Sequence, residues 1–124
     1  MPARPELSLR LPNSPGSLAS VCRELAAERI QIHALSLDAS GMLRLIVDNH
    51  VRAIAVLKER HRSLLTRDVI VVTGGGTDAL AAAFGLVAGA GVNVEYAYVG
   101  AGESMGVAVL GVDDAQRAAA AAGV

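Results

Sequence analysis

The amino-acid sequence predicts an α+β fold in which one small module occurs twice along the chain. The first observation behind this prediction is a helical pattern of apolar residues that returns 62 positions later. The pattern consists of Leu18, Val21, Cys22 and Leu25 in the first half, and of Leu80, Ala83, Phe84 and Val87 in the second. Because self-similarity at a fixed spacing is typical of repeated structural units, we expect two like-folded halves.

Strand-like residues on either side of this helix repeat with the same spacing, which is the second observation. Leu7 and Leu9 correspond to Val69 and Val71, and Ile30 and Ile32 correspond to Val92 and Val94. The third observation is size, since a module of ~60 residues buries only ~60% of the surface of its unfolded chain and is marginally stable alone. We therefore expect two modules, residues 1–67 and 68–124, that pack side by side.

The first module begins with a strand and a helix. Apolar and polar residues alternate over Leu7–Leu11, as they do in a half-buried strand. The segment Pro12–Gly16 interrupts the strand, and Asn13 or Ser14 is expected to cap a helix that continues to about Arg29.

A hairpin and a second helix follow. We expect strands at Ile30–Leu37 and Met42–Val47, joined by a turn at Asp38–Gly41. The second helix is expected to begin at a cap formed by Asp48 or Asn49. Its apolar face is expected to consist of Val51, Ile54, Ala55 and Leu57.

A short strand at Ser63–Arg67 completes the order β-α-β-β-α-β, which is that of a ferredoxin-like unit. The second module repeats this course with one difference, because no residues remain for its own last strand. We therefore expect a sheet edge there that a second chain could cover. The expected strands of the second module are Val69–Thr73, Val92–Val99 and Met105–Val112, with a long turn at Gly100–Ser104. Its expected helices are Thr77–Gly89 and a final helix capped by Asp113 or Asp114.

Composition excludes several classes of function. The 124 residues are 52% hydrophobic and carry a net charge of −1, which gives no electrostatic reason to bind nucleic acid or an anionic membrane. Met1–Arg10 lacks the apolar segment of a signal peptide, and Ala79–Val92 is too short to cross a bilayer. Cys22 is the single cysteine, and we expect it to be a small buried hydrophobe. A reducing, cytoplasmic location fits these features.

The connection Asn13–Leu18 is the strongest candidate for a ligand site. It joins a strand to the start of a helix, and Gly16 lets the backbone approach a ligand closely. Main-chain N–H groups and the helix dipole at such a place favour a carboxylate or another anion. The alternative is a capped helix start without a ligand, and physics alone leaves both readings open.

The residues around this connection resemble an ACT domain, the small ligand-binding module of amino-acid metabolism. The resemblance is carried by L-x-L-x-N-S-P-G-S-L-A-x-V from Leu9, by L-A-x-x-x-I-x-I ending at Ile32, and by Leu43–Asp48. Together with the repeat it covers nearly the whole chain, so the protein resembles a tandem pair of ACT modules. The resemblance implies antiparallel sheets with helices on one face, and amino acids bound at the seam between modules.

The resemblance also implies which residues hold the ligand. An Asn in the first loop matches Asn13, and an Asn after the helix matches Asn93 in the second module, where the first module has Gln31. Main-chain N–H groups could bind the ligand carboxylate, whereas side-chain oxygens and strand carbonyls could accept from its ammonium group. The expected ligand-binding residues are Asn13, Ser14, Pro15, Gly16, Ser17, Leu18, Gln31, Ile32, Asn93 and Val94.

The corresponding loop of the second module departs from this pattern. Gly75, Thr77 and Asp78 stand where Asn13, Pro15 and Gly16 would correspond, so the Asn side chain and the Pro-Gly turn are both missing. We interpret the loop Gly74–Asp78 as altered in specificity, unoccupied or structural. It also lacks the lysine of a phosphate-binding P-loop.

Other chemistry finds little support in the sequence. The spacings of His33, His50 and His61 match no metal-ligand motif, and we expect His61 at a solvated helix end. No acid–base pair or activated nucleophile can be inferred. Tyr96 and Tyr98 share one strand face, where they could pack under a helix or line a ligand seam or dimer contact.

The sequence therefore predicts a non-enzymatic regulatory protein that senses an amino acid or a similar small molecule. We expect no cofactor and no metal, a homodimer, and a partner enzyme that receives the signal. The alternative is a structural or protein-interaction module whose pocket is vestigial, which the departures at Gly75–Asp78 favour.

Overall fold

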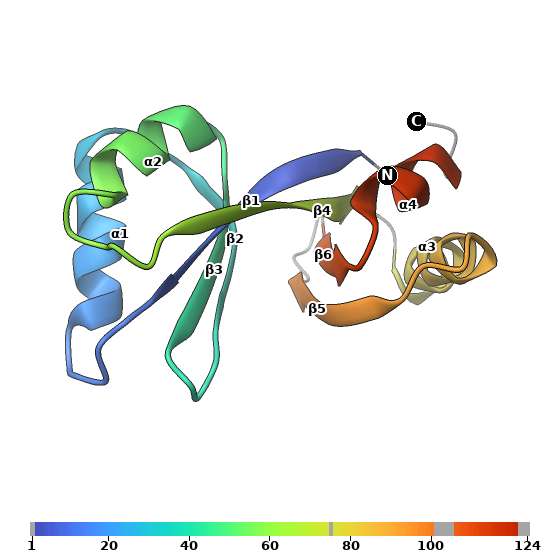
Figure 1. The fold of residues 1–124 in the computed structure, drawn as a ribbon, viewed down its shortest axis with the longest axis horizontal. Helices are drawn as coiled ribbons and strands as arrows, with labels where there is room; N and C mark the ends of the chain where they lie inside the picture. The colour runs from blue at the N-terminus through green and yellow to red at the C-terminus, as the bar shows by residue number, and fades with distance from the viewer. Residues whose placement is uncertain (1, 75, 101–105, 122–124) are drawn as a thin grey trace. The chain divides into compact units, whose positions relative to one another are not determined.

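The computed structural model describes residues 2–74, 76–100 and 106–121, and its chain divides into two compact units. One unit is Pro5–Arg67; the other combines Asp68–Val124 with the N-terminal residues up to Arg4. The predicted modules 1–67 and 68–124 differ from these units in the first four residues. The elements, drawn in Figure 1, are β1 (Ala3–Arg10), α1 (Ser17–Ala27), β2 (Ile32–Leu37), β3 (Met42–Val47), α2 (His50–Leu57), β4 (Leu65–Thr73), α3 (Thr77–Gly89), β5 (Val94–Gly100), β6 (Val107–Val112) and α4 (Ala115–Ala121).

The unit Pro5–Arg67 is a sheet in the order β2-β3-β1-β4 with both helices on one face (Figure 1). The strands β1, β2 and β3 pair antiparallel, with Leu7 opposite Leu45 and Leu37 opposite Leu43. Alternate residues of each strand point toward α1 and α2, because successive side chains of a strand lie on opposite faces. The resulting core contains Leu7, Leu9, Val21, Leu25, Leu43, Leu45, Ala53 and Leu57, all almost completely buried. The predicted ferredoxin-like order is confirmed.

The other unit repeats this plan with β4, β5, β6, α3 and α4. The strand β6 lies between β4 and β5, and Leu110 and Val112 pack with Ile70 and Val87 in the core. The described residues after Asp68 form no further strand besides β4, β5 and β6. The corresponding place beside β4 is taken by the start of the chain, where the Val71 N–H donates to the Pro2 carbonyl at 3.1 Å. The edge that we expected a second chain to cover is therefore paired within this chain.

Two strands are longer than the sequence pattern predicts. The predicted strands Ser63–Arg67 and Val69–Thr73 form one strand, β4, which continues through Arg67 and Asp68. Because neither Gly nor Pro interrupts the chain there, main-chain pairing continues although the side chains are charged and exposed. Similarly, β1 begins at Ala3 rather than Leu7.

Helix starts were predicted with mixed success. Asn49 caps α2 by accepting from the Arg52 N–H at 3.1 Å, and Asp114 caps α4 by accepting from the Arg117 N–H at 3.0 Å. The predicted cap of α1 by Asn13 or Ser14 is wrong, because Gly16 takes the cap position without a side-chain hydrogen bond. The apolar face of α2 is also narrower than predicted.

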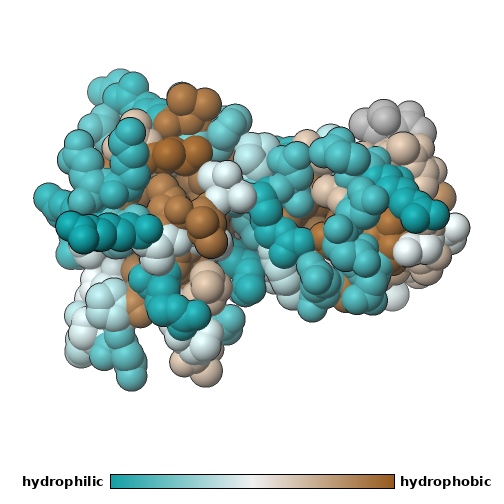
Figure 2. Space-filling view, in the orientation of Figure 1, coloured by the Kyte–Doolittle hydropathy of each residue, from teal (hydrophilic) through white to brown (hydrophobic). Residues whose placement is uncertain are grey.

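The error on α2 concerns Val51, which is 68% exposed, whereas Ala53 and Leu57 are buried. Figure 2 shows the resulting apolar surface over α2, between more hydrophilic side chains. The apolar stripe of α2 is therefore wider than the part of the helix that the sheet of this small unit covers.

Candidate functional site

A surface hollow of about 670 Å³ lies between two connections of the unit Pro5–Arg67. One wall is the β1–α1 connection with the first turns of α1, and the other is the turn between β2 and β3. These connections meet because β1 and β3 are antiparallel, with Arg10 at the end of β1 opposite Met42 at the start of β3. The expected site residues that line the hollow are Asn13, Ser14, Gly16, Ser17 and Leu18; Pro15 is not among its lining residues.

The start of α1, which lines this hollow, contains main-chain N–H groups without an intrahelical partner. Gly16 has a left-handed conformation with φ of 85°, which turns the chain into α1. The first N–H groups of a helix have no partner within the helix. In the part of the chain that the structure describes, the N–H groups of Leu18 and Ala19 have no hydrogen-bond acceptor. The hydroxyl groups of Ser14 and Ser17 bond to each other at 2.8 Å.

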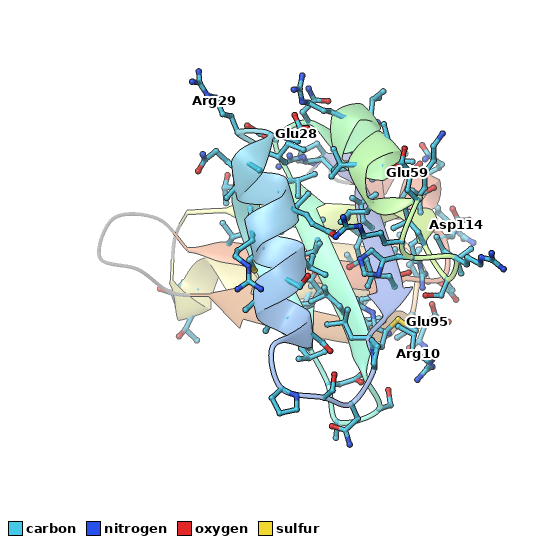
Figure 3. The ribbon with its side chains drawn as sticks, turned by 90° about the vertical axis from the view of Figure 1, so that its left-hand side faces the viewer. Arg10, Glu28, Arg29, Glu59, Glu95 and Asp114 are labelled. Atoms are coloured by element: carbon cyan, nitrogen blue, oxygen red, sulfur yellow. The ribbon has the colours of Figure 1, made fainter. Side chains whose placement is uncertain are left out.

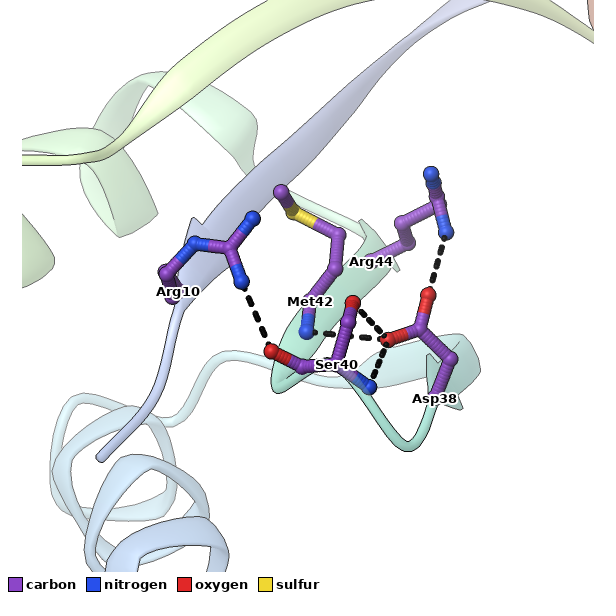
Figure 4. Close-up of polar contacts among 5 residues, drawn as sticks. All are labelled: Arg10, Asp38, Ser40, Met42 and Arg44. Carbon is purple, nitrogen blue, oxygen red and sulfur yellow. Dashed lines mark hydrogen bonds and ion pairs between the residues drawn. The ribbon is translucent and has the colours of Figure 1, made fainter. Parts of the chain in front are cut away.

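The β2–β3 turn is organised around the carboxylate of Asp38, as Figure 4 shows. Its Oδ1 accepts from the Ser40 hydroxyl at 2.5 Å, from the Ser40 N–H at 3.0 Å and from the Met42 N–H at 3.2 Å. Its Oδ2 forms an ion pair with Arg44 at 3.5 Å. These interactions, the Ser40 hydroxyl bond first among them, hold the pKa of the Asp38 carboxyl below its usual value.

Direct bonds tie this turn to the end of β1. The Leu11 N–H donates to the Gly41 carbonyl at 2.8 Å, and Arg10 donates to the Ser40 carbonyl at 2.7 Å. Gly41 has a φ of 90°, and a Cβ atom there would lie 2.9 Å from the Leu11 carbonyl oxygen. The turn therefore approaches the β1 end as closely as glycine allows.

Cys22 lines the hollow instead of the core, so the prediction of a buried hydrophobe is wrong. Val21 and Leu25 on the same helix are completely buried, whereas Cys22 is only half-buried. Cys22 lines the hollow together with Leu37 of the edge strand β2.

Gln31 and Ile32 lie at the opposite end of the sheet from this hollow. Ile32 pairs with Val47 at the far end of β3, and the Gln31 N–H donates to Asp48 at 3.0 Å. In Figure 3, Glu28 and Arg29 mark this end of α1, away from the loop that precedes the helix. Within this unit the structure does not bring Gln31 together with Asn13.

Asn93 and Val94 belong to the other unit and repeat this local arrangement. The Asn93 N–H donates to Asp113 at 3.0 Å, just as Gln31 donates to Asp48. That Asn93 or Gln31 joins Asn13 at a seam between modules stays a prediction.

The β2–β3 turn is the part of the site that sequence reasoning missed. The β-α-β-β order itself contained the signal, since it places the first loop and the hairpin turn at the same end of the sheet. Asp38, Ser40 and Gly41 in that turn are typical turn residues, and they were interpreted only as a connection.

A smaller hollow of about 190 Å³ occupies the corresponding place in the other unit. Gly74, Gly76, Thr77, Leu80 and Val99 are among the residues that line it. Gly75 and most of the predicted turn Gly100–Ser104 lie outside the described residues.

The remaining titratable groups offer no metal site in the described part of the chain. No group of three or more His, Cys, Asp or Glu side chains there could hold a metal ion. His61, expected to be solvated, is only 16% exposed and lies 3.4 Å from Glu24. Among the described helices, none has both the length and the hydropathy needed to span a membrane.

Comparisons with known proteins agree with this geometry. A family model described as "ACT domain pair" matches residues 4–122. A protein of Bacteroides thetaiotaomicron has a similar structure, with 27% sequence identity and a TM-score of 0.80 over 96% of this chain and 85% of that one. No curated protein sequence matches the chain.

Regulatory subunits of aspartate kinase share the fold. The ligand-free subunit of Thermus thermophilus is 21% identical, with a TM-score of 0.65 over 94% of this chain and 87% of that one. The subunit of Thermus flavus is 19% identical, with a TM-score of 0.61 over 94% of this chain and 88% of that one.

Proposed function

Because the chain belongs to the ACT domain pair family, we propose that it is a regulatory module that binds an amino acid at the β1–α1 connection. One observation supports this proposal most. The loop that carries the resemblance, Asn13–Leu18, lines the hollow of about 670 Å³ in the unit Pro5–Arg67 with all its residues except Pro15. A volume of this order is typical of small-molecule sites, which occupy about 300–1,000 Å³.

The chemistry of the loop fits the two charged groups that every free amino acid carries. The unpaired N–H groups of Leu18 and Ala19, at the positive end of the α1 dipole, would receive the carboxylate. The Asn13 side-chain oxygen, together with main-chain carbonyls of the loop, would accept from the ammonium group. Each bond to a charged group contributes about 1.5–3 kcal/mol.

We propose that the bound amino acid acts by changing how the modules pair, and that another protein receives the signal. Two of the structurally similar proteins are described as regulatory subunits of aspartate kinase. By analogy, a partner enzyme would be regulated here, in the cytoplasm, while this chain itself performs no catalysis. Such regulation requires only that the ligand bind one arrangement of the modules better than another.

We further propose that the chain forms a homodimer through α3. The chain has no charged residue between Asp78 and Glu95, and Phe84 and Leu86 are 36% and 45% exposed. Arg23 and Glu24 of α1 occupy the repeat positions of Gly85 and Leu86. Arg23 is exposed, and Glu24 is mostly buried in ion pairs with Arg60 and His61, so α1 carries charged residues where α3 has none.

Charge at the two ends of α3 supports a second copy as the partner. Asp78 lies in the first turn of α3, and a Cβ atom at Gly91, just after the helix, would lie 3.7 Å from the Arg117 guanidinium. Antiparallel packing of two α3 helices would place Asp78 of each copy near Arg117 of the other.

Isothermal titration with the Asn13→Ala variant tests the proposed site. We expect the affinity for the bound amino acid to fall about ten-fold or more, because one acceptor of the ammonium group is removed. Asn49→Ala is a matched control, since Asn49 caps α2 outside the hollow. It should lower the stability of the protein and leave the affinity unchanged. If the Asn13→Ala variant and the unaltered protein bind with equal affinity, the proposal that this loop binds the ligand is wrong.

The alternative is an interaction module with a vestigial pocket. The smaller hollow of the second unit, about 190 Å³, favours this alternative for that half of the chain. It predicts no response to any amino acid, and a role in assembly only.

A further inference from the structure

We propose that the hollow beside Asn13 selects amino acids with an uncharged, apolar side chain, and that Leu37 and Cys22 form the wall that contacts it. This inference rests on the proposed amino-acid binding and adds the class of the ligand. It concerns Leu37 at the end of β2 and Cys22 on α1, which line the hollow together with the loop that would hold the carboxylate and the ammonium group.

The charges around the hollow argue against a charged ligand side chain. Asp38 is the only Asp, Glu, Lys, Arg or His among the lining residues, and its carboxylate is already occupied. Three donors bind its Oδ1, and Arg44 pairs with its Oδ2. A lysine-like ligand would have to compete with Arg44 for the Asp38 carboxylate, which is 45% exposed.

The described lining offers no cation to an acidic ligand side chain. Neither nearby guanidinium group lines the hollow: Arg44 is paired with Asp38, and Arg10, which keeps its charge, donates to the Ser40 carbonyl. Moving a charge out of water without a partner is strongly unfavourable. The site therefore disfavours side chains of either charge.

Apart from Asp38, Asn13 and three serines, the lining residues are apolar or glycine, and part of this apolar surface is open to solvent. Leu37 on the edge strand β2 is 43% exposed, and Cys22 on α1 is half-buried. Leu18, Ala19 and Ala39 extend the same surface. Exposed apolar area of this kind gains favourable free energy when a ligand side chain covers it.

Titration of the full chain with leucine, methionine, phenylalanine, lysine and aspartate tests the inference. We expect the tightest of the three apolar amino acids to bind at least ten-fold more tightly than lysine and aspartate. Tighter binding of lysine or aspartate would overturn the inference and leave the proposed function intact. If none of the twenty common amino acids binds, the proposed function fails, and the inference fails with it.

Leu37→Lys tests the wall directly. Because Leu37 is already exposed, the substitution should not unfold the protein, and it places a cation at the hollow. We expect affinity for the apolar ligand to fall about ten-fold and affinity for aspartate to rise. Leu35→Lys is the matched control, since Leu35 lies two residues earlier on the same strand face, is 37% exposed and does not line the hollow. Equal effects of the two substitutions would exclude Leu37 as the wall.

The single cysteine gives a second, independent measurement. Iodoacetamide should alkylate Cys22 in the free protein, and a saturating apolar amino acid should slow this reaction several-fold. The ligand must be shown to bind by titration under the same conditions. Bound ligand that leaves the alkylation rate unchanged would place its side chain elsewhere and contradict the inference.

Discussion

Single residues determine how closely the two walls of the hollow approach. Gly41 is the clearest case, because it combines a φ of 90° with a close approach to the Leu11 carbonyl oxygen. Gly16 has a similar φ of 85°, but a Cβ atom there would meet nothing within 4 Å. The two glycines therefore separate the cost of backbone strain from the cost of a steric clash.

We expect Gly41→Ala to destabilise the protein by about 2–4 kcal/mol, because it adds a clash to the ~1–2 kcal/mol of left-handed strain. Gly16→Ala should cost only the strain, about 1–2 kcal/mol. Urea unfolding of both variants and of the unaltered protein measures the difference. If both variants lose the same stability, the turn is looser than the structure shows.

At the scale of single residues, the sequence predicted local hydrogen bonds better than it predicted how exposed a side chain is. The caps at Asn49 and Asp114 were predictable because a cap needs only a side-chain oxygen at a helix start. The position of Cys22 was not, because its apolar helix position does not reveal how far the sheet extends over it.

Strands and helices differ in how much of their extent the sequence reveals. Helix α3 and strand β3 have the predicted bounds, because continuous apolar spacing defines both. The strand β4 crosses the charged pair Arg67 and Asp68, and its length depends on main-chain pairing that side-chain patterns do not encode. The pairing of Pro2 with Val71 was not predicted either, because it too depends on main-chain hydrogen bonds.

The apolar surface of α3 gives a prediction at the scale of an element. Leu86→Glu restores the residue type that α1 has at the same repeat position, and it should weaken the proposed homodimer about ten-fold or more by burying a charge. Sedimentation velocity over a range of protein concentrations measures this change. Val51→Glu is the control, because Val51 on α2 is 68% exposed and should not affect assembly.

Two results of the sedimentation experiment would contradict the dimer proposal. The first is an unaltered chain that is monomeric at every concentration. The second is a dimer that stays intact in the Leu86→Glu variant. Either result would leave the uncharged face of α3 without the proposed partner.

At the scale of the whole molecule, the repeated modules of the sequence and the compact units of the structure differ only in the first four residues. We propose that 1–67 and 68–124 are the repeated modules, although residues up to Arg4 belong structurally with the second unit. The repeat pattern predicted the fold class, because both halves carry the order β-α-β-β-α. It also located the Asn13 loop; the opposite wall required the three-dimensional arrangement of β2 and β3.

The most direct test of the account is a thermal-unfolding panel of the full chain with each of the twenty common amino acids. A ligand at 100 times its dissociation constant stabilises the native state by about 2.7 kcal/mol, which raises the Tm of a protein this small by several degrees. We predict such a rise with at least one amino acid, and its loss in the Asn13→Ala variant. An unchanged Tm with all twenty would contradict the assignment of the hollow as an amino-acid site.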